Sequence, residues 1–209
     1  MAREQMAIMK KYLILCEGID EKRFLIEYLN SQALLSDPRL SQEIQVMDFG
    51  GINELSNFLM GLRGADGFDD VSTLMIIRDA EKDCNAASQS VVGSLKSAGF
   101  IAPSKTSEWI DSNGIRIGFL LFPSCSLDPC NGTLEDLCLK ILNDDHSDER
   151  MEDIELLLDK CSKSYEESFS KIHKNKLHAY LSTKNDFAGM KIGEAAQAGA
   201  FDWNSPVLR

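Results

Sequence analysis

Short apolar runs alternate along the chain with segments whose apolar residues recur every three or four positions. The runs have the length and continuity of buried strands, and the segments between them have the period of amphipathic helices. The predicted strands are Lys11–Cys16, Ile44–Phe49, Val71–Ala80 and Ile115–Phe122. Strands that alternate with helices predict an α/β fold, with a mostly parallel sheet flanked by helices on both faces.

The ends of the predicted helices are marked by capping residues and glycines. Asp20 is the predicted N-cap of the first helix, and Thr133 is that of the helix after the fourth strand. A third helix is predicted from about Ala86 to Ala98. The second helix ends near Gly64, and its apolar face consists of Ile52, Leu55, Leu59 and Leu62.

The chain changes character after Leu142. Residues 143–155, NDDHSDERMEDIE, form a strongly acidic, linker-like stretch, and the rest is helical by pattern. The last segment contains a short Ala-rich helix and Trp203, which we expect to dock on the core. We therefore divide the chain into an α/β core, residues 1–143, and an acidic helical extension packing on it, residues 144–209.

Length and composition place the chain among ordinary globular proteins. Its 209 residues are 44% hydrophobic, which is enough for one core. No apolar run approaches the roughly 20 residues that span a bilayer, so no membrane partner is expected. The N-terminal apolar run ends in Cys-Glu-Gly and not in a small-residue cleavage site, which favours a strand over a signal peptide. We expect a cytoplasmic protein.

The cysteines and histidines give no metal-binding spacing. There is no Cys-x-x-Cys pair, and the histidines at 146, 173 and 178 are scattered, so no zinc site is predicted. A redox pair of Cys125 and Cys130 has only proximity in its favour. We expect reduced thiols at Cys16, Cys84, Cys125, Cys130, Cys138 and Cys161.

The net charge of −11 restricts the ways in which the chain can act on nucleic acid. Proteins that coat nucleic acid usually present a basic face to the phosphates. An acidic chain can still act on phosphates where metal ions neutralise the contact. The charge thus disfavours tight, metal-free DNA binding, and it is compatible with a metal-dependent phosphate site.

Acidic residues follow the predicted strands at the points where the strands end. Glu17 follows the first strand, and Asp79 ends the third, with Glu81 and Asp83 at alternate positions behind it. Glu135 begins the helix after the fourth strand. Ligands of an open parallel sheet gather at the carboxyl ends of its strands, and Mg²⁺ prefers carboxylate oxygens. The pattern predicts a Mg²⁺ or Mn²⁺ site at this edge.

Any one of these acids has a structural explanation as well. An acid after a strand is more often a helix cap or a solvated charge, and Asp20, Asp79 and Asp83 each fit that role. Glu135 and Asp136 lie where the helix macrodipole favours acids anyway. Two separate strand ends each have an acid directly after an apolar run, and this repetition favours a metal site over a purely structural role.

Several segments together resemble a known family. They are CEGIDEKRFL, the Gly-Gly after the second strand, MIIRDAEKD, GTLEDL and MKIGEAAQAGAFDWNSPVL. An apolar strand followed by Glu-Gly and a helix, with a later strand ending in Asp-x-acid, resembles the TOPRIM domain of topoisomerases, primases, maturation ribonucleases and OLD-family nucleases. The whole set is most similar to an uncharacterised bacterial family of stand-alone TOPRIM-like proteins related to OLD-type nucleases. The resemblance implies that residues 1–143 form a TOPRIM-like, Rossmann-like core.

The resemblance assigns roles residue by residue. Glu17 matches the strand-one glutamate, which performs general acid/base work or binds metal. Asp79 and Glu81 match the Asp-x-Asp metal pair, although Glu81 is one methylene longer than the usual second acid, and Asp83 would share that task. Glu135 resembles the extra glutamate of OLD-type nucleases, which would allow a second metal.

The resemblance also implies a late lysine near the metals, for which Lys184 and Lys191 are the candidates; for each, a solvated surface charge is the commoner role. The chain has no tyrosine in a recognisable nucleophile setting, no zinc ribbon and no phosphate-binding loop, so a topoisomerase, a primase and a self-contained ATPase are disfavoured. An ATPase would have to be a partner protein.

The sequence therefore predicts a Mg²⁺-dependent enzyme acting on phosphodiester bonds, most simply a nuclease that contacts nucleic acid through its metal. The alternative is a non-catalytic TOPRIM-like module that binds a nucleotide or a protein partner. A third reading is an adaptor whose acidic helical tail engages a basic protein. The first two interpretations require Glu17 and Asp79 to lie within reach of one metal ion, whereas the third predicts dispersed, solvated acids.

Overall fold

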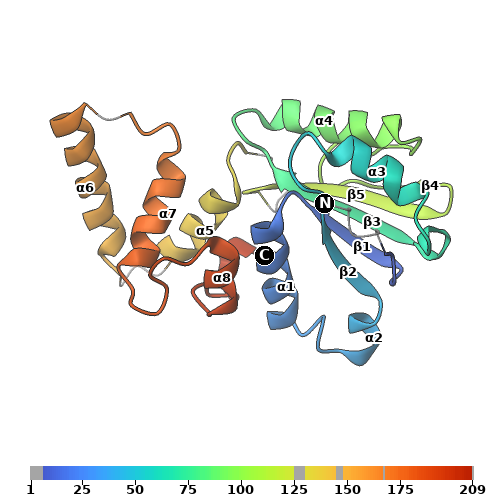
Figure 1. The fold of residues 1–209 in the computed structure, drawn as a ribbon, viewed down its shortest axis with the longest axis horizontal. Helices are drawn as coiled ribbons and strands as arrows, with labels where there is room; N and C mark the ends of the chain where they lie inside the picture. Colours follow the sequence, from blue (N-terminus) through green and yellow to red (C-terminus); the bar gives the residue numbers. More distant parts are fainter. Residues whose placement is uncertain (1–6, 125–129, 145–147, 167, 209) are drawn as a thin grey trace, which may run out of the picture.

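A computed structural model describes residues 7–124, 130–144, 148–166 and 168–208. Within these residues the chain forms one five-stranded sheet in the order β2-β1-β3-β5-β4 (Figure 1). The strands are β1 (Tyr12–Cys16), β2 (Ile44–Asp48), β3 (Thr73–Asp79), β4 (Trp109–Ser112) and β5 (Ile115–Phe122). All pairings are parallel except that of β4 with β5. The predicted α/β class with a mostly parallel sheet is confirmed, and β4 is an edge strand that the pattern did not predict.

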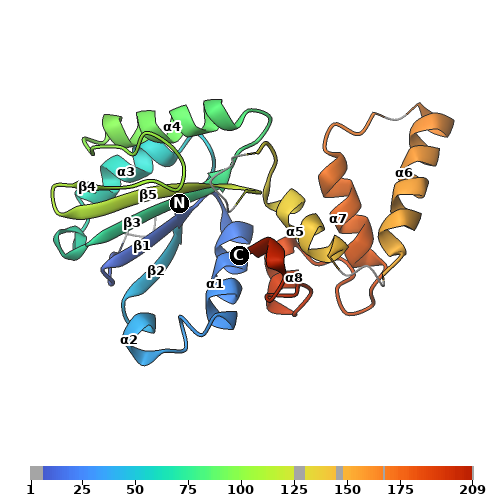
Figure 2. The same cartoon turned by 180° about the vertical axis from the view of Figure 1, so that it is seen from behind.

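Helices lie on both faces of the sheet and beyond one of its ends. In both views α3 and α4 cover one face, α1 lies against the other with α8 packed beside it, and α5, α6 and α7 extend past the end of the strands (Figures 1 and 2). The helices are α1 (Ile19–Ser31), α2 (Pro38–Ser41), α3 (Leu55–Arg63), α4 (Cys84–Ser97), α5 (Leu134–Asn143), α6 (Arg150–Tyr165), α7 (Ile172–Ser182) and α8 (Ile192–Gln197).

Two cores lie on opposite faces of the sheet because successive strand residues point to opposite sides. Leu13 and Leu15 of β1 pack in the core under α3 and α4. Cys16 and Ile77 pack in the second core, with the apolar faces of α1, α5, α7 and α8. None of the helices in the described residues is long and apolar enough to cross a membrane.

Two helix starts differ from the prediction. Asp20 is not the N-cap of α1, because the cap is Gly18. The carboxylate of Asp20 instead accepts a hydrogen bond from the backbone N–H of Gly193 at 3.1 Å, at the start of α8. Ile52 lies in the turn before α3 and is 40% exposed, while the rest of the predicted apolar face, Leu55, Leu59 and Leu62, is buried as expected.

The C-terminal third of the chain is helical, as predicted. The stretch 143–155 is only partly linker-like, because α6 already begins at Arg150; residues 145–147 lie outside the described part. Trp203 docks on the core as expected, with its ring centroid 5.1 Å from that of Phe24.

The described cysteines are free thiols, as expected. The suggested Cys125–Cys130 pair cannot be placed, because Cys125 lies outside the described residues.

A candidate site of converging carboxylates

The ends of β1 and β3 place two predicted site residues at one edge of the sheet. β1 and β3 are neighbouring parallel strands, and Cys16 pairs with Ile77 in their register. Glu17 follows β1 directly and Asp79 is the last residue of β3. Both therefore lie at the carboxyl edge, where ligands of parallel sheets bind.

The two glycines after β2 fix the backbone of Glu17. The N–H groups of Gly50 and Gly51 donate to the carbonyl oxygen of Glu17 at 3.1 and 2.9 Å. Both glycines have positive φ values, 83° and 117°, which other residues rarely adopt. The Gly-Gly pair thus joins the end of β2 to the start of the candidate site.

Asp79 joins the sheet to α5. Its side chain is buried, and its Oδ1 accepts a hydrogen bond from the backbone N–H of Leu134 at 2.8 Å. Leu134 is the first residue of α5, so the bond brings a helix N-terminus to the end of β3. A carboxylate is favoured there by the free N–H groups of the first turn.

The capping of α5 then places Glu135 beside Asp79. The backbone N–H of Thr133 donates to the carboxylate of Asp136 at 2.8 Å, which confirms Thr133 as the N-cap. Glu135 is only 6% exposed, and its Oε1 lies 2.7 Å from Nζ of Lys174 on α7. Burial acts to raise the pKa of Glu135, but bonds from Lys174 and Thr133 outweigh it and lower the pKa below its ordinary value.

Glu17 is the least satisfied of these acids. Its Oε2 is buried and has no hydrogen-bond partner among the described residues. Burial raises the pKa of Glu17, the guanidinium of Arg78 opposes that shift, and the nearby charge of Glu81 adds to it. A buried carboxylate oxygen without a partner is costly, so this atom is available to a ligand.

Asp79 lies among three other carboxylates. Burial, together with the charges of Glu21, Glu17 and Glu135 in that order, raises its pKa to about 8, against the opposing hydrogen bond from Leu134. Like charges this close disfavour ionisation unless a cation or a proton is shared between them. The cluster therefore consists of Glu17, Glu21, Asp79 and Glu135.

Glu21 is a member of the cluster that the sequence reasoning missed. It lies in the first turn of α1, four residues after Glu17. Burial, and then the charges of Glu17 and Glu135, raise its pKa. The available signal was the segment EGIDE itself, because the turn between β1 and α1 returns the second acid towards the first.

Glu81 and Asp83 are placed differently from each other. Glu81 is exposed and has a positive φ of 57°; its backbone pairs with that of Gly132 through bonds of 2.8 and 2.7 Å. It is near enough to influence the pKa of Glu17. Asp83 caps α4, and its Oδ1 accepts from the N–H groups of Asn85 and Ala86 at 2.9 and 3.0 Å. The structure thus places Glu81 near Glu17, at the margin of the cluster, and gives Asp83 a structural task.

Neither of the suggested lysines lies beside the cluster's acids. Lys184 pairs with Asp148 at 3.3 Å, and Lys191 is the N-cap of α8. The lysine at the cluster is Lys174. No local pattern marks it, because its position depends on the packing of α7 against α5.

A second cation lies behind Asp79 in the sheet. Arg78 is 1% exposed; its Nε donates to the carbonyl oxygen of Asp79 at 3.2 Å, and its Nη1 donates to Ser90 Oγ at 3.2 Å. Its charge lowers the pKa of Glu17. Two cations, Arg78 and Lys174, thus offset part of the charge of four carboxylates.

The cluster offers carboxylate oxygens, which hard cations prefer as ligands, but these side chains are not arranged as a complete metal site. Among the described residues, no three His, Cys, Asp or Glu side chains stand close enough to hold a metal ion as they are placed. The unpartnered Oε2 of Glu17 and the raised pKa of Asp79 nevertheless mark a place where a cation would relieve repulsion. Oxygen donors of this kind suit Mg²⁺.

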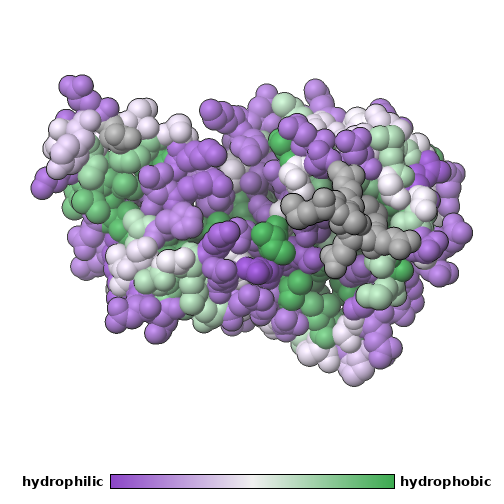
Figure 3. All heavy atoms as spheres, viewed as in Figure 1, coloured by the Kyte–Doolittle hydropathy of each residue, from purple (hydrophilic) through white to green (hydrophobic). Residues whose placement is uncertain are grey.

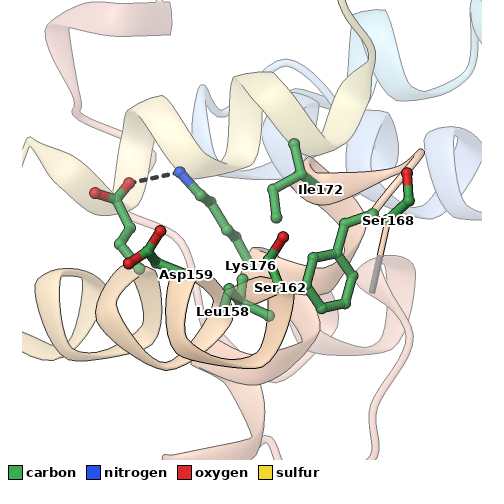
Figure 4. Close-up of a pocket in the computed structure, with 8 residues that line it drawn as sticks. Leu158, Asp159, Ser162, Ser168, Ile172 and Lys176 are labelled. Carbon is green, nitrogen blue, oxygen red and sulfur yellow. Dashed lines mark hydrogen bonds and ion pairs between the residues drawn. The ribbon is translucent and has the colours of Figure 1, made fainter. Parts of the chain in front are cut away.

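A groove elsewhere in the molecule is distinct from the cluster. It lies between α6 and α7 and is lined by Leu158, Asp159, Ser162, Phe169 and Ile172, among others (Figure 4). Lys176 crosses it to Glu155, whereas Lys174 reaches Glu135. The two lysines therefore connect α7 to different neighbours, and only Lys174 belongs to the carboxylate cluster.

The comparison with protein-family models covers nearly the whole chain. Residues 11–209 match the model described as "Protein of unknown function (DUF3226)". The chain belongs to this family. The DUF3226 match begins just before β1 and includes α8, so both the sheet and the C-terminal helices belong to the family unit. No curated protein and no solved structure matches the chain.

Proposed function

We propose that this DUF3226 protein is a Mg²⁺-dependent, TOPRIM-like enzyme that acts on phosphodiester bonds, most simply a nuclease. The observation that carries the proposal is the convergence of Glu17, Glu21, Asp79 and Glu135 from β1, α1, β3 and α5 at the carboxyl edge of a parallel sheet. A structural cap or a solvated loop charge does not account for four acids at one edge, three of which, Glu17, Glu21 and Asp79, have raised pKa values.

The residues that would hold Mg²⁺ are those whose carboxylates a cation would stabilise most. Glu17 has an unpartnered buried oxygen, and Asp79 has the pKa raised to about 8. Glu21, Glu81 and Glu135 would complete the oxygen donors, directly or through water. When bound, the metal polarises a phosphate and lowers the pKa of a water molecule.

The chain's own residues supply the remaining chemistry. Glu17, with a raised pKa, is suited to accept or donate a proton at its free oxygen. Lys174 holds Glu135 ionised and places a positive charge at the edge where a phosphate would approach. Asp83 has no part in this scheme, because its carboxylate caps α4.

The TOPRIM-like interpretation extends to the organisation of the chain. Residues 1–143 would be the TOPRIM-like core and residues 144–209 the extension packing on it. The contact of α8 with α1, through Gly193 and Asp20, supports such packing. Nucleic acid would bind through the metal, and an ATPase partner would supply any nucleotide-driven step.

A non-catalytic TOPRIM-like module that binds a nucleotide or a protein partner is the second candidate. Two observations favour it. The described residues contain no ready-made group of three metal ligands, and Glu135 is already neutralised by Lys174. In that case the cluster would take a cation without turnover.

Turnover on nucleic acid separates the two candidates. Single-stranded DNA, duplex DNA and RNA would be incubated with the wild type in Mg²⁺ or Mn²⁺, beside Glu17→Gln and the control Asp69→Asn. Asp69 is an exposed acid of the η1 turn (Phe68–Asp70), before the start of β3 and away from the carboxyl edge. We expect Glu17→Gln to lose on the order of 10²-fold or more in rate and the control to keep wild-type activity.

A Glu17→Gln variant that cleaves as fast as the wild type would refute the role of Glu17. A wild type with no activity on any of the three substrates, but with metal binding lost in Glu17→Gln, would favour the binding module.

A further inference from the structure

Helix α6 contacts the rest of the protein through one narrow face. Of its 16 residues only Met151 and Ile154 are buried. Its inner side meets α7, where Lys176 Nζ lies 2.5 Å from Glu155 Oε1 across the groove (Figure 4). The remaining surface of α6 faces solvent.

The outward side of α6 carries two large apolar residues at its centre. Leu156 is 68% exposed and Leu157 is 55% exposed. Apolar atoms gather on the molecular surface over α6 and α7 (Figure 3). Two adjacent exposed leucines at the centre of a helix lack the stabilisation that burial of apolar surface would provide.

Charges are distributed unequally on the two sides of these leucines. Asp153 precedes them and Lys160 follows them, at helical spacing and on the same outward face. No ion pair within the described residues involves either side chain. Glu149 and Glu152 add negative charge towards the N-terminal end of this face, whereas Lys163 near the C-terminal end is paired with Asp159 at 2.6 Å, so Lys160 is the cation that this end offers to a partner.

Two copies of α6 that lie antiparallel have complementary charges, because the acidic end of each lies beside the basic end of the other. In an antiparallel pair centred between residues 156 and 157, residue 153 of one helix lies opposite residue 160 of the other. A two-fold axis repeats every contact, so each Asp153 faces a Lys160 and each Lys160 faces an Asp153. The four leucines meet at the axis.

We propose that α6 pairs with α6 of a second copy of this chain, antiparallel about a two-fold axis at Leu156 and Leu157. Nucleic acid and anionic lipid are repelled by the acids of this face and by the net charge of −11. A uniformly basic partner would meet Lys160, which is unpaired within the described residues. A second copy matches the acidic half and the basic half at once.

The dimer is weak. One helix per chain buries an area at or below the small end of specific interfaces, under about 1,200 Å² in total. The net charge of each chain opposes association at low salt. Self-association is therefore expected as the protein concentration rises through the micromolar range, and moderate salt favours it.

Sedimentation of the full chain tests the interface. We expect the mass of the wild type to rise from 23.3 kDa towards twice that value with increasing concentration. Leu156→Gln/Leu157→Gln should stay at the single-chain mass, with an unchanged circular dichroism spectrum because both side chains are already exposed. A wild type that remains a single chain throughout, or a double variant that associates as well as the wild type, overturns the proposal.

Charge exchange then tests the antiparallel register. Asp153→Lys and Lys160→Asp each place like charges opposite each other on both sides of the axis, so each variant alone should associate at least severalfold less tightly. A mixture of the two should form a heterodimer, because each lysine at 153 then faces an aspartate at 160, and each lysine at 160 faces an aspartate at 153. This register is refuted if either single variant associates as tightly as the wild type. It is also refuted if the mixture associates no more tightly than each variant alone.

Discussion

Lys174 of α7 and Glu135 of α5 form an ion pair of 2.7 Å that joins the C-terminal helices to the carboxylate edge of the sheet. Glu135 is buried and Lys174 is partly exposed, so the ammonium closes one side of the cluster. A metal ion at the cluster would compete with this ammonium for the same negative charge. We therefore predict that metal binding is coupled to the docking of α7.

Replacing Lys174 tests that coupling. Lys174→Gln should bind Mg²⁺ several-fold more tightly, because a competing cation is removed, and its apo form should lose about 1 kcal/mol or more of stability because Glu135 stays buried without its partner. The matched control is Lys176→Gln on the same helix, which breaks the pair with the exposed Glu155. Calorimetric titration with Mg²⁺ should give wild-type affinity for the control; tighter binding by both variants would point to a general charge effect.

The buried carboxyl of Asp79 makes stability depend on pH. Its pKa is about 8 in the folded protein against an ordinary value of 3.8. Between these values the native state holds a proton that the unfolded chain has released, so the free energy of unfolding falls as the pH rises from about 4 to about 8. Asp79→Asn removes this dependence, and its advantage over the wild type should grow to the order of a few kcal/mol at pH 8 without metal.

Urea unfolding at several pH values measures the difference between the two proteins. Parallel stability curves for the wild type and Asp79→Asn would contradict the raised pKa. Saturating Mg²⁺ should reduce the difference at pH 8, because the metal stabilises the ionised carboxylate that the variant lacks.

The strands and most helices of this chain were predictable because hydrophobic period alone determines them. The runs around Leu13 and Leu74 are buried on one face of the sheet and at least partly buried on the other, so their continuous apolar sequence predicts strands. The edge strand β4 was not predictable in this way. Of its four residues Trp109 and Asp111 are exposed and only Ser112 is buried, so the strand is defined by pairing with β5 and not by its own pattern.

The sequence predicted the site residues that stand at strand ends, but not those that are placed by the packing of helices. Glu17 and Asp79 lie at the carboxyl ends of parallel strands, so they lie at the same edge of the sheet, and the pairing of β1 with β3 brings them together. Glu21 and Lys174 depend on the angle of α1 and on the packing of α7 against α5, which no local pattern contains. Asp20 and Asp83 show the converse, because acids beside the site motifs hold α8 and cap α4 instead.

Two glycines offer a matched test of the packing of α8 on α1. A Cβ at Gly193 would lie 2.8 Å from the Cβ of Arg23, whereas a Cβ at Gly93 in α4 would meet nothing within 4 Å. Gly193→Ala should destabilise the protein by about 1–3 kcal/mol through overpacking. Gly93→Ala should stabilise it by up to about 1 kcal/mol through helix propensity. Thermal unfolding of both variants checks the opposite signs; equal shifts would mean that α8 does not pack closely on α1.

Removing the strand-end acids tests metal-induced stabilisation. Mg²⁺ should raise the melting temperature of the wild type in proportion to the logarithm of its concentration above the dissociation constant. Asp79→Asn/Glu81→Gln should show no such shift, and its apo form should be more stable than the apo wild type because the mutual repulsion is reduced. Asp69→Asn should respond to Mg²⁺ as the wild type does. Identical shifts for the wild type and the double variant would rule out a metal site at these residues.

The central claim is that carboxylates from β1, β3 and α5 form one divalent-cation site. Its most direct test is anomalous diffraction from crystals of the wild-type protein soaked in Mn²⁺, which replaces Mg²⁺ at oxygen sites. The account predicts a Mn²⁺ peak within ligand distance of Glu17 and Asp79, lost in Glu17→Gln crystals soaked in the same way. A wild-type map with no peak at these two side chains, or with Mn²⁺ bound only elsewhere, would contradict it.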